Sequence, residues 1–185
     1  VEDPIQSMPG INRYSIDKLL NKVEEAVRFS IPAIAIFPQI EPSLKNAEGS
    51  LAYDEKNLVC RSIKNIKKEF SGIGIICDVA LDPFTDHGHD GLVINDKIDN
   101  DKTLDILEKQ ALVQVNAGCD VIAPSDMMDG RVGRIRKVLD INNFQDTLIL
   151  SYAAKYASGF YGPFRDAIGS GSKLGKDGKL TYQMD

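Results

Sequence analysis

The chain has 185 residues, of which 43% are hydrophobic and 26% are charged, and its formal net charge is -5. This composition is typical of a globular protein with one sizeable core, and the negative charge argues against a nucleic-acid or anionic-membrane binder. No apolar run is long enough to span a bilayer, and the acidic start VEDPIQSMPG does not have the form of a signal peptide. Three widely spaced cysteines, Cys60, Cys77 and Cys119, predict reduced, packed thiols in a cytoplasmic protein.

Helical and strand-like patterns alternate along the chain. The first expected helix follows Ser15 as its N-cap, and its apolar residues repeat at helical spacing up to Val27. Further helices are expected at 58–70, at 104–115, ended by Gly118, and at 132–139. Strands are expected at 33–37, 72–81, 120–126 and 147–155. The strand-like runs are continuously apolar, which favours a parallel sheet with helical crossovers.

Two architectures fit this order, an open doubly wound sheet and a TIM (β/α)8-barrel. The barrel is favoured because polar, Gly-rich and Pro-rich segments follow the strands, as on the carboxyl rim of such barrels. About four strands can be counted, whereas a barrel has eight strands in about 250 residues. We therefore expect residues 1–185 to be the central part of a single α/β domain with a barrel fold. On their own they would form an incomplete barrel fragment.

The segment CDVALDPFTDHGHDG, at 77–91, is rich in possible metal ligands. It contains Asp78, Asp82, Asp86 and Asp90, together with two histidines. Carboxylates select hard cations such as magnesium over zinc. A solvated turn rich in Asp and Gly explains the same composition, so both interpretations stay open.

Two other loops also have ordinary structural explanations. Ser125, Asp126 and Asp129 follow an expected strand, where a helix-capping role is more common than catalysis. The Gly-rich segment 169–179 does not fit the Walker phosphate-loop pattern, and it is interpreted either as a mobile lid or as a surface loop.

Lys155 ends the last apolar run, where burial of a charge costs free energy unless the charge is paired or used. Its side chain could reach water at little cost. Alternatively, an apolar barrel mouth would lower its pKa and give a neutral amine for Schiff-base chemistry with a ketone. Arg165 and Lys179 could then bind a substrate carboxylate. The aromatic residues expected to exclude water are Tyr156, Phe160, Tyr161 and Phe164.

Several segments together resemble the porphobilinogen synthase (δ-aminolaevulinic acid dehydratase) family. They are PIQSMPGINRYS, CDVALDPFTDHGHDG, APSDMMDGRVG, LSYAAKYASGFYGPFRDA and TYQMD, and they extend from Pro4 to Asp185. The resemblance implies a (β/α)-barrel lyase of haem biosynthesis. It condenses two δ-aminolaevulinate molecules to porphobilinogen with loss of two waters, assembles as a homo-octamer and needs no organic cofactor.

The resemblance also implies roles for individual residues. Lys155 would be one of two Schiff-base lysines. The residues implied to bind substrate or line its pocket are Arg165, Lys179, Gln183, Tyr161, Phe164, Ser125 and Asp78, and Gly169 to Gly178 would be the lid. Zinc-dependent members have cysteines at the positions of Ala80, Asp82 and Asp90. This chain therefore resembles the aspartate-rich type, with Asp82 and Asp90 as metal ligands and magnesium or no metal in place of zinc.

The family's second Schiff-base lysine follows YQMD and lies outside this sequence, so we expect the isolated chain to be inactive. Two alternatives remain from the residues alone. One is a class I aldolase-like barrel with a single Schiff-base lysine, and the other is a non-catalytic metal-binding α/β domain.

Overall fold

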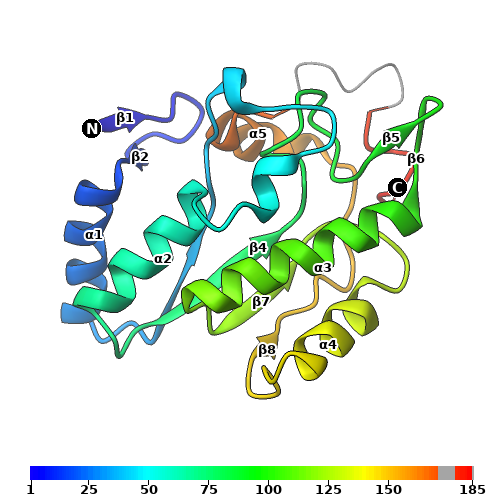
Figure 1. The fold of residues 1–185 in the computed structure, drawn as a ribbon. Helices are drawn as coiled ribbons and strands as arrows, with labels where there is room; N and C mark the ends of the chain where they lie inside the picture. Colours follow the sequence, from blue (N-terminus) through cyan, green and yellow to red (C-terminus); the bar gives the residue numbers. More distant parts are fainter. Residues whose placement is uncertain (171–177, 185) are drawn as a thin grey trace.

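Four apolar runs form a parallel sheet through the middle of the molecule (Figure 1). The computed structural model describes residues 1–170 and 178–184. The strands lie in the order β3 (Ala33–Ile36), β4 (Gly74–Val79), β7 (Val121–Pro124) and β8 (Leu148–Ile149). All three strand pairs are parallel, as the continuously apolar runs predicted.

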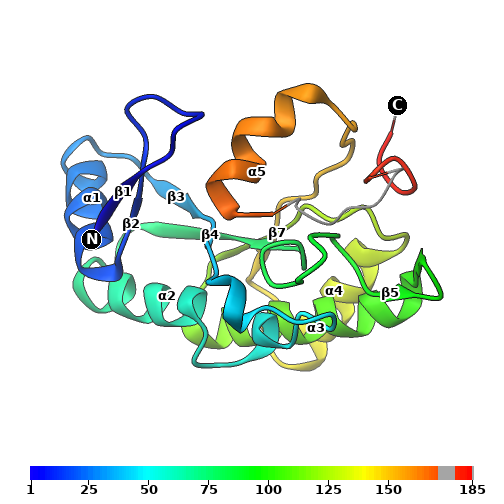
Figure 2. The same cartoon turned by 90° about the horizontal axis from the view of Figure 1, so that it is seen from above.

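The four helices that precede or connect the strands of this sheet decide between the two expected architectures. They are α1 (Ile16–Arg28), α2 (Leu58–Glu69), α3 (Asn100–Ala117) and α4 (Arg131–Ile141). Figure 2 shows all four on one face of the sheet, while α5 (Gly162–Ile168) lies on the other side. A doubly wound sheet has crossover helices on both faces, so this arrangement is that of a (β/α)-barrel segment.

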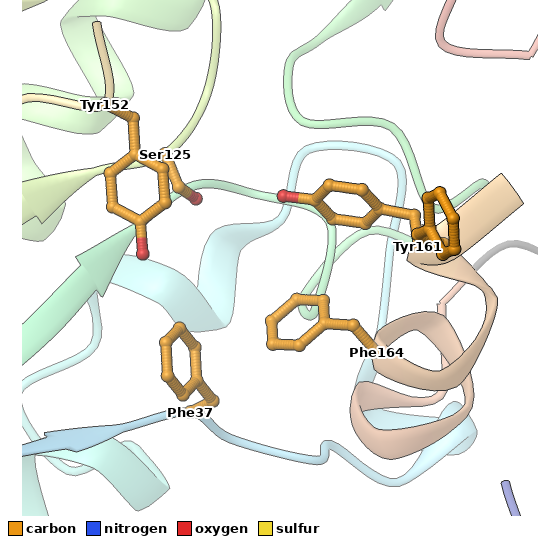
Figure 3. Close-up of a pocket in the computed structure, with 6 residues that line it drawn as sticks. Phe37, Ser125, Tyr152, Tyr161 and Phe164 are labelled. Atoms are coloured by element: carbon orange, nitrogen blue, oxygen red, sulfur yellow. The ribbon is translucent and has the colours of Figure 1, made fainter. Parts of the chain in front are cut away.

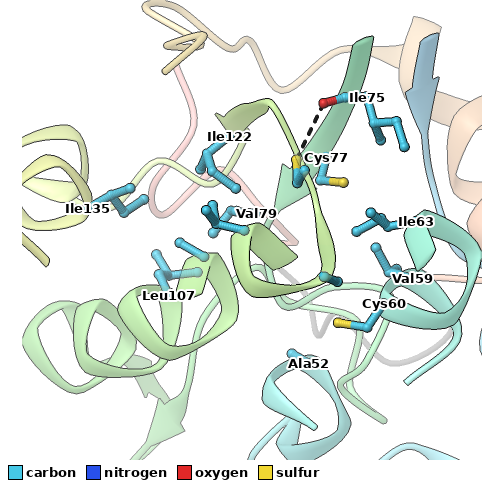
Figure 4. Packing of buried hydrophobic residues seen from close by; sticks show 14 of the residues in the cluster. Ala52, Val59, Cys60, Ile63, Ile75, Cys77, Val79, Leu107, Ile122 and Ile135 are labelled. Atoms are coloured by element: carbon cyan, nitrogen blue, oxygen red, sulfur yellow. Dashed lines mark hydrogen bonds between the residues drawn. The ribbon is translucent and has the colours of Figure 1, made fainter. Parts of the chain in front are cut away.

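The core fills the space between the sheet and its helices (Figure 4). Ile75, Cys77 and Val79 alternate along β4 and are fully buried. Ile63 of α2 and Leu107 of α3 are also fully buried and belong to the same apolar cluster. Strand periodicity of two and helix periodicity of 3.6 together bring these side chains to one layer.

The cysteines are packed thiols, as expected from their spacing. Cys60, Cys77 and Cys119 are free and buried. Cys119 Sγ donates to the Ile75 carbonyl at 3.4 Å, the contact dashed in Figure 4. Burial raises the pKa of Cys60 to about 11 and also raises the pKa of Cys77, so these two thiols stay protonated at neutral pH.

Smaller elements surround the sheet. β1 (Glu2–Pro4) pairs with β2 (Asn12–Tyr14), and β5 (Val93–Ile94) pairs with β6 (Lys97–Ile98), both antiparallel. The described residues also form three short 3-10 helices, η1 (Pro42–Leu44), η2 (Ser50–Tyr53) and η3 (Gly159–Tyr161). None of the helices in the described part of the chain is long and apolar enough to cross a membrane.

The structure corrects three local expectations. The last strand ends at Ile149, because β8 is an edge strand with β7 as its one paired neighbour among the described strands, and Lys155 lies in an irregular segment beyond it. Ser15 occupies the N-cap position of α1, but its hydroxyl contacts Asp17 and Val1 instead of a helix N–H. The cap of α4 is Gly130 in a left-handed conformation, not Asp129.

The face of the sheet away from the helices is partly open. Ile76, Val121 and Leu148 are neighbours across three strands on this face. Leu148 is 64% exposed and Leu150, beyond the strand end, is 50% exposed. In a complete barrel this face is the packed interior.

Candidate active site

The side chain of Lys155 is buried at the carboxyl edge of the sheet. The Met184 N–H donates to the Lys155 carbonyl at 3.0 Å, which fixes the backbone of the irregular segment after β8. Lys155 Nζ donates to the Ser125 carbonyl at 2.5 Å and lies 3.5 Å from Asp90 Oδ2. The residue is 6% exposed. The amine therefore does not reach bulk water, which excludes the snorkelling interpretation.

A second buried lysine binds the two predicted metal-ligating carboxylates. Lys179 Nζ donates to Asp82 Oδ2 at 3.0 Å and also to Asp90 Oδ1. Gln183 Nε2 donates to Asp90 Oδ2 at 3.5 Å. The acidic loop after β4 and the C-terminal segment are far apart in sequence, so these contacts close a long loop. Each buried charge has a charged partner, as burial demands.

The charge state of Lys155 differs from the expectation. Burial alone would lower the pKa of Lys155, but the carboxylates of Asp90 and Asp82 outweigh burial and raise the pKa above the usual lysine value. The same balance raises the pKa of Lys179. The prediction of a neutral Lys155 amine was wrong for this state of the site, because the acidic loop lies next to the amine. An ammonium ion must lose a proton before it can attack a ketone.

Asp78 is a carboxyl group that can hold a proton near neutral pH. Burial, and then the charge of Asp82, raise the pKa of Asp78 to about 7, while the Ser125 hydroxyl lowers it in part. Its Oδ1 atom is buried and has no hydrogen-bond partner. A carboxyl group that titrates near neutrality can give or take a proton under ordinary conditions. Its position on β4 follows from strand alternation, which turns it away from Cys77 and Val79.

A pocket of about 250 Å³ lies beside Lys155. Its lining residues are Phe37, Ser125, Tyr152, Phe160, Tyr161 and Phe164. In Figure 3 the hydroxyl of Tyr161 points across the pocket toward Ser125, and the rings of Phe37 and Phe164 lie on the same side. Lys155 Nζ lies 5.4 Å from the centre of the Tyr161 ring. The pocket is thus a small, mostly aromatic cavity next to a buried amine.

The aromatic residues around Lys155 differ in what they cover. Phe164 packs edge-to-face on Phe37, with ring centres 5.2 Å apart, and on Tyr161 at 5.9 Å. Tyr156 and Phe160, which we also expected to exclude water, are 52% and 95% exposed. The predicted shielding therefore comes from Tyr161 and Phe164 together with Phe37.

Arg165 lies on α5, next to Phe164. Within the described residues its guanidinium makes no hydrogen bond and no ion pair. Lys179, the other predicted carboxylate-binding cation, is occupied by Asp82 and Asp90. Arg165, which follows the pocket residue Phe164 in the sequence, thus keeps its donors available for a ligand within the described part of the chain.

The donor set for a metal is incomplete. Among residues 1–170 and 178–184, no three His, Cys, Asp or Glu side chains lie close enough together to hold a metal ion. Asp82 and Asp90 instead share the Lys179 ammonium. These residues, as arranged here, do not fit a metal centre. The expected lid falls mostly on 171–177, which lie outside the described residues.

Comparison with known proteins matches this chain to one family. The family model "Delta-aminolevulinic acid dehydratase" matches residues 1–185. The chain belongs to that family. The dehydratase of Bradyrhizobium diazoefficiens is 58% identical over 183 residues, which are 99% of this chain and 52% of that protein. A chloroplastic dehydratase of Arabidopsis thaliana is 47% identical over 100% of this chain and 43% of its own length.

A solved structure supports the same assignment. The delta-aminolevulinic acid dehydratase of Toxoplasma gondii, in complex with the reaction product porphobilinogen, has a TM-score of 0.96 and 46% sequence identity. The match covers 100% of this chain and 53% of that one. The chain spans about half the length of the dehydratases it matches. The predicted barrel fold is confirmed for this half.

Sequence reasoning assigned no role in the candidate site to Tyr182 or Asp126. Tyr182 accepts a hydrogen bond from the Asp90 N–H at 3.3 Å and lies 3.0 Å from His89 Nδ1. Asp126 is fully buried, and its Oδ2 lies 3.9 Å from Arg131 Nε. The one sequence feature that could have pointed to Tyr182 is its position next to Gln183, a predicted substrate-binding residue. No sequence pattern distinguishes Asp126 from a helix cap.

Proposed function

We propose that the protein containing this chain is a porphobilinogen synthase. This lyase condenses two molecules of δ-aminolaevulinate to porphobilinogen, with loss of two waters, in porphyrin and haem biosynthesis. The observation that carries the proposal is a buried lysine, Lys155, beside an aromatic pocket in a chain of the dehydratase family. Family membership supports the reaction, and the placement of Lys155 supports its role in it.

Lys155 is the proposed nucleophile. One proton leaves Lys155 Nζ for the neighbouring Asp90 carboxylate, 3.5 Å away. The free amine then adds to the ketone carbon of one substrate molecule, the ketone oxygen leaves as water, and a carbon–nitrogen double bond remains. The Ser125 carbonyl, which accepts from Lys155 at 2.5 Å, keeps the nitrogen directed at the pocket. The second Schiff-base lysine implied by the family resemblance lies outside this sequence.

Asp78 and the cationic residues have supporting roles in this proposal. Asp78, with a pKa of about 7, donates the proton that the departing water requires. Arg165 binds the substrate carboxylate through its planar guanidinium. Lys179 and Gln183 hold Asp90 in place, and the lining residues Tyr161, Phe164 and Ser125 enclose the substrate.

We also propose that the protein is of the non-zinc type. Asp82 and Asp90 are oxygen donors, which suit magnesium better than zinc, and all three cysteines are buried in the core. Because both carboxylates bind Lys179, a magnesium ion there would have to displace that ammonium. Turnover that survives a zinc chelator is the expected result, and loss of turnover restored by zinc would contradict this assignment.

Assembly, location and the activity of the isolated chain follow the same proposal. The family resemblance supports a homo-octamer, and three free thiols support a reducing compartment such as the cytoplasm. We expect residues 1–185 alone to be inactive. Leu148 and Leu150 are exposed on the open sheet face, and exposed apolar area favours aggregation.

Borohydride trapping tests the proposed function directly. The full-length protein is incubated with aminolaevulinate, reduced with borohydride and mapped by peptide mass spectrometry. We expect an irreversible adduct on the peptide that carries Lys155 and formation of porphobilinogen in the unreduced control. A full-length protein that forms porphobilinogen without any adduct on Lys155 would refute the assigned nucleophile. Failure to form porphobilinogen would refute the activity.

A further inference from the structure

Helix α5 carries two residues of the proposed site but is too short to hold itself in place. It has seven residues, Gly162–Ile168, and includes Phe164 and Arg165. Isolated helices shorter than about 12 residues are marginal in water. The position of α5 over the pocket must therefore come from contacts with other parts of the chain.

The N-terminal hairpin of β1 and β2 supplies the strongest of these contacts. Arg13 Nε donates to the Ala167 carbonyl at 2.8 Å, and Arg13 Nη2 donates to the Asp166 carbonyl at 2.6 Å. The last carbonyls of a helix have no partner within the helix. One guanidinium thus binds two of them, although the Asp166 carbonyl also accepts from the Gly169 N–H at 3.2 Å. A cation at this end also interacts favourably with the negative pole of the helix dipole.

The guanidinium of Arg13 is itself held in position. Arg13 lies directly across the hairpin from Asp3, and Arg13 Nη1 donates to Asp3 Oδ2 at 2.7 Å. Ser7, in the loop between the two strands, donates through its hydroxyl to Asp166 Oδ2 at 2.5 Å and through its N–H at 3.2 Å. This loop reaches toward α5 in both ribbon views (Figures 1 and 2).

The opposite side of α5 faces the pocket. Phe164 contacts Phe37 and Tyr161, which also line the pocket. A shift of α5 therefore moves both an aromatic wall and the backbone that carries Arg165. Lys45 adds one more anchor, since its Nζ donates to the Gly169 carbonyl at 2.9 Å.

We propose that Arg13 is a positioning residue of the active site. It touches no pocket residue, yet it holds the C-terminal end of α5 and thereby places Phe164 and Arg165 against the substrate. This inference rests on the proposed function, because it assigns Arg13 to the binding of the same substrate. It links the first residues of the chain to a helix 154 positions later.

Steady-state kinetics on the full-length protein test this role. We expect Arg13→Gln to raise KM for aminolaevulinate about tenfold while kcat changes less than about threefold, because the lost contact acts on binding geometry. Arg13→Lys keeps the charge but can reach one carbonyl at a time. Its KM should therefore lie between the KM of wild type and that of Arg13→Gln. Arg28→Gln, which removes an exposed pair with Glu24, is the matched control and should change neither constant.

A double-mutant cycle separates positioning from general stability. If Arg13 acts through α5, the effects of Arg13→Gln and Arg165→Gln on KM overlap. The KM of the double variant then rises by less than the product of the two single fold-changes. Fully multiplicative effects would overturn the inference. So would an unchanged KM in Arg13→Gln accompanied by a lower melting temperature.

Hydrogen exchange gives a readout that does not need activity. In the full-length protein, Arg13→Gln should speed amide exchange in residues 162–170 at least about tenfold over wild type, with α3 unchanged as internal reference. Unchanged exchange in α5 refutes the inference even if the wild-type enzyme is active. Faster exchange in a protein that forms no porphobilinogen would support the anchor while refuting the proposed function.

Discussion

The helix-covered face of the sheet and its carboxyl edge solve the problem of burial in different ways. On the covered face, Ile63, Ile75 and Leu107 are fully buried without any charge. At the carboxyl edge, Asp90, Lys155 and Lys179 are almost as deeply buried, and every one of them carries or borders a charge. The covered face stabilises the fold because it buries apolar area. At the carboxyl edge, burial of charged groups costs free energy, and the pairing of these charges offsets part of that cost.

The two regions also differ in the kind of buried polar atom that lacks a hydrogen-bond partner. On the covered side these atoms include the uncharged amide oxygens Gln110 Oε1 and Gln114 Oε1 of α3, whereas near the carboxyl edge they belong to the ionisable side chains Asp78, Asp126 and Arg131. Atoms of this kind are costly, and they concentrate where a protein binds or converts something. The comparison therefore predicts that substitutions at the edge affect turnover, and that substitutions in the covered face affect stability.

Replacing the buried amine should have the largest effect. Lys155→Met in the full-length protein keeps the volume of the side chain but removes the nucleophile, so we expect porphobilinogen formation to fall by about 10⁴-fold or more. The control is Lys22→Met, whose side chain is exposed and pairs with Glu25. Turnover of Lys155→Met within tenfold of wild type would exclude this residue from the chemistry.

A cavity in the helix-covered face should lower stability and leave turnover nearly unchanged. Leu107→Ala removes a fully buried side chain and should destabilise the protein by about 2–5 kcal/mol, measured by urea unfolding. The turnover of the folded fraction should stay within about twofold, since Leu107 packs on the far side of the sheet from the pocket. Leu44→Ala, at a position that is 60% exposed, serves as the comparison. A large loss of turnover without destabilisation would break the division between the two regions.

Replacing Asp78, at the carboxyl edge, should change the pH dependence of kcat/KM. Asp78→Asn removes a group with a pKa of about 7, so the profile of kcat/KM should lose a transition near that pH. We expect turnover at neutral pH to fall about 100-fold, the usual size of a proton-transfer contribution. An Asn variant that retains the transition would assign it to another group.

Asp126 should produce the smallest effect, and it concerns stability. Burial raises the pKa of Asp126 from 3.8 to about 7, although the Met128 N–H and Arg131 lower it in part. Because the folded pKa is the higher one, its stabilising contribution is complete below pH 3.8 and is lost as the pH rises through about 7. Between pH 6 and pH 8 wild type should lose about 1.4 kcal/mol more than Asp126→Asn.

Urea unfolding of both proteins at the two pH values measures this difference. Since Asp78 titrates in the same range in both proteins, the difference between them isolates Asp126. Identical pH dependence in wild type and Asp126→Asn would show that this carboxyl group stays ionised throughout.

The sequence was sufficient for what depends on local periodicity. Helices α1 and α2 begin where the sequence predicted, because the spacing of their apolar residues is a local signal. The parallel sheet with helical crossovers was also predicted, from the continuously apolar runs. The length of β8 could not be predicted, because an apolar run forms a strand only as far as a partner strand lies beside it.

Sequence reasoning named the residues of the candidate site but not how they pair. Lys155, Asp82 and Asp90 were singled out from residue type, but the contact of Lys179 with both carboxylates depends on how a distant segment folds back. For the same reason the charge of Lys155 was predicted wrongly. The pKa of a buried group depends on its neighbours in space, and those neighbours are not visible in the sequence.

The three cysteines lie on the helix-covered side of the sheet, away from the pocket. Iodoacetamide and soft metals such as mercury react with accessible thiolates, so they should find no target near Lys155 while the protein is folded. Alkylation would then report on unfolding, and inhibition would appear only together with loss of the native state.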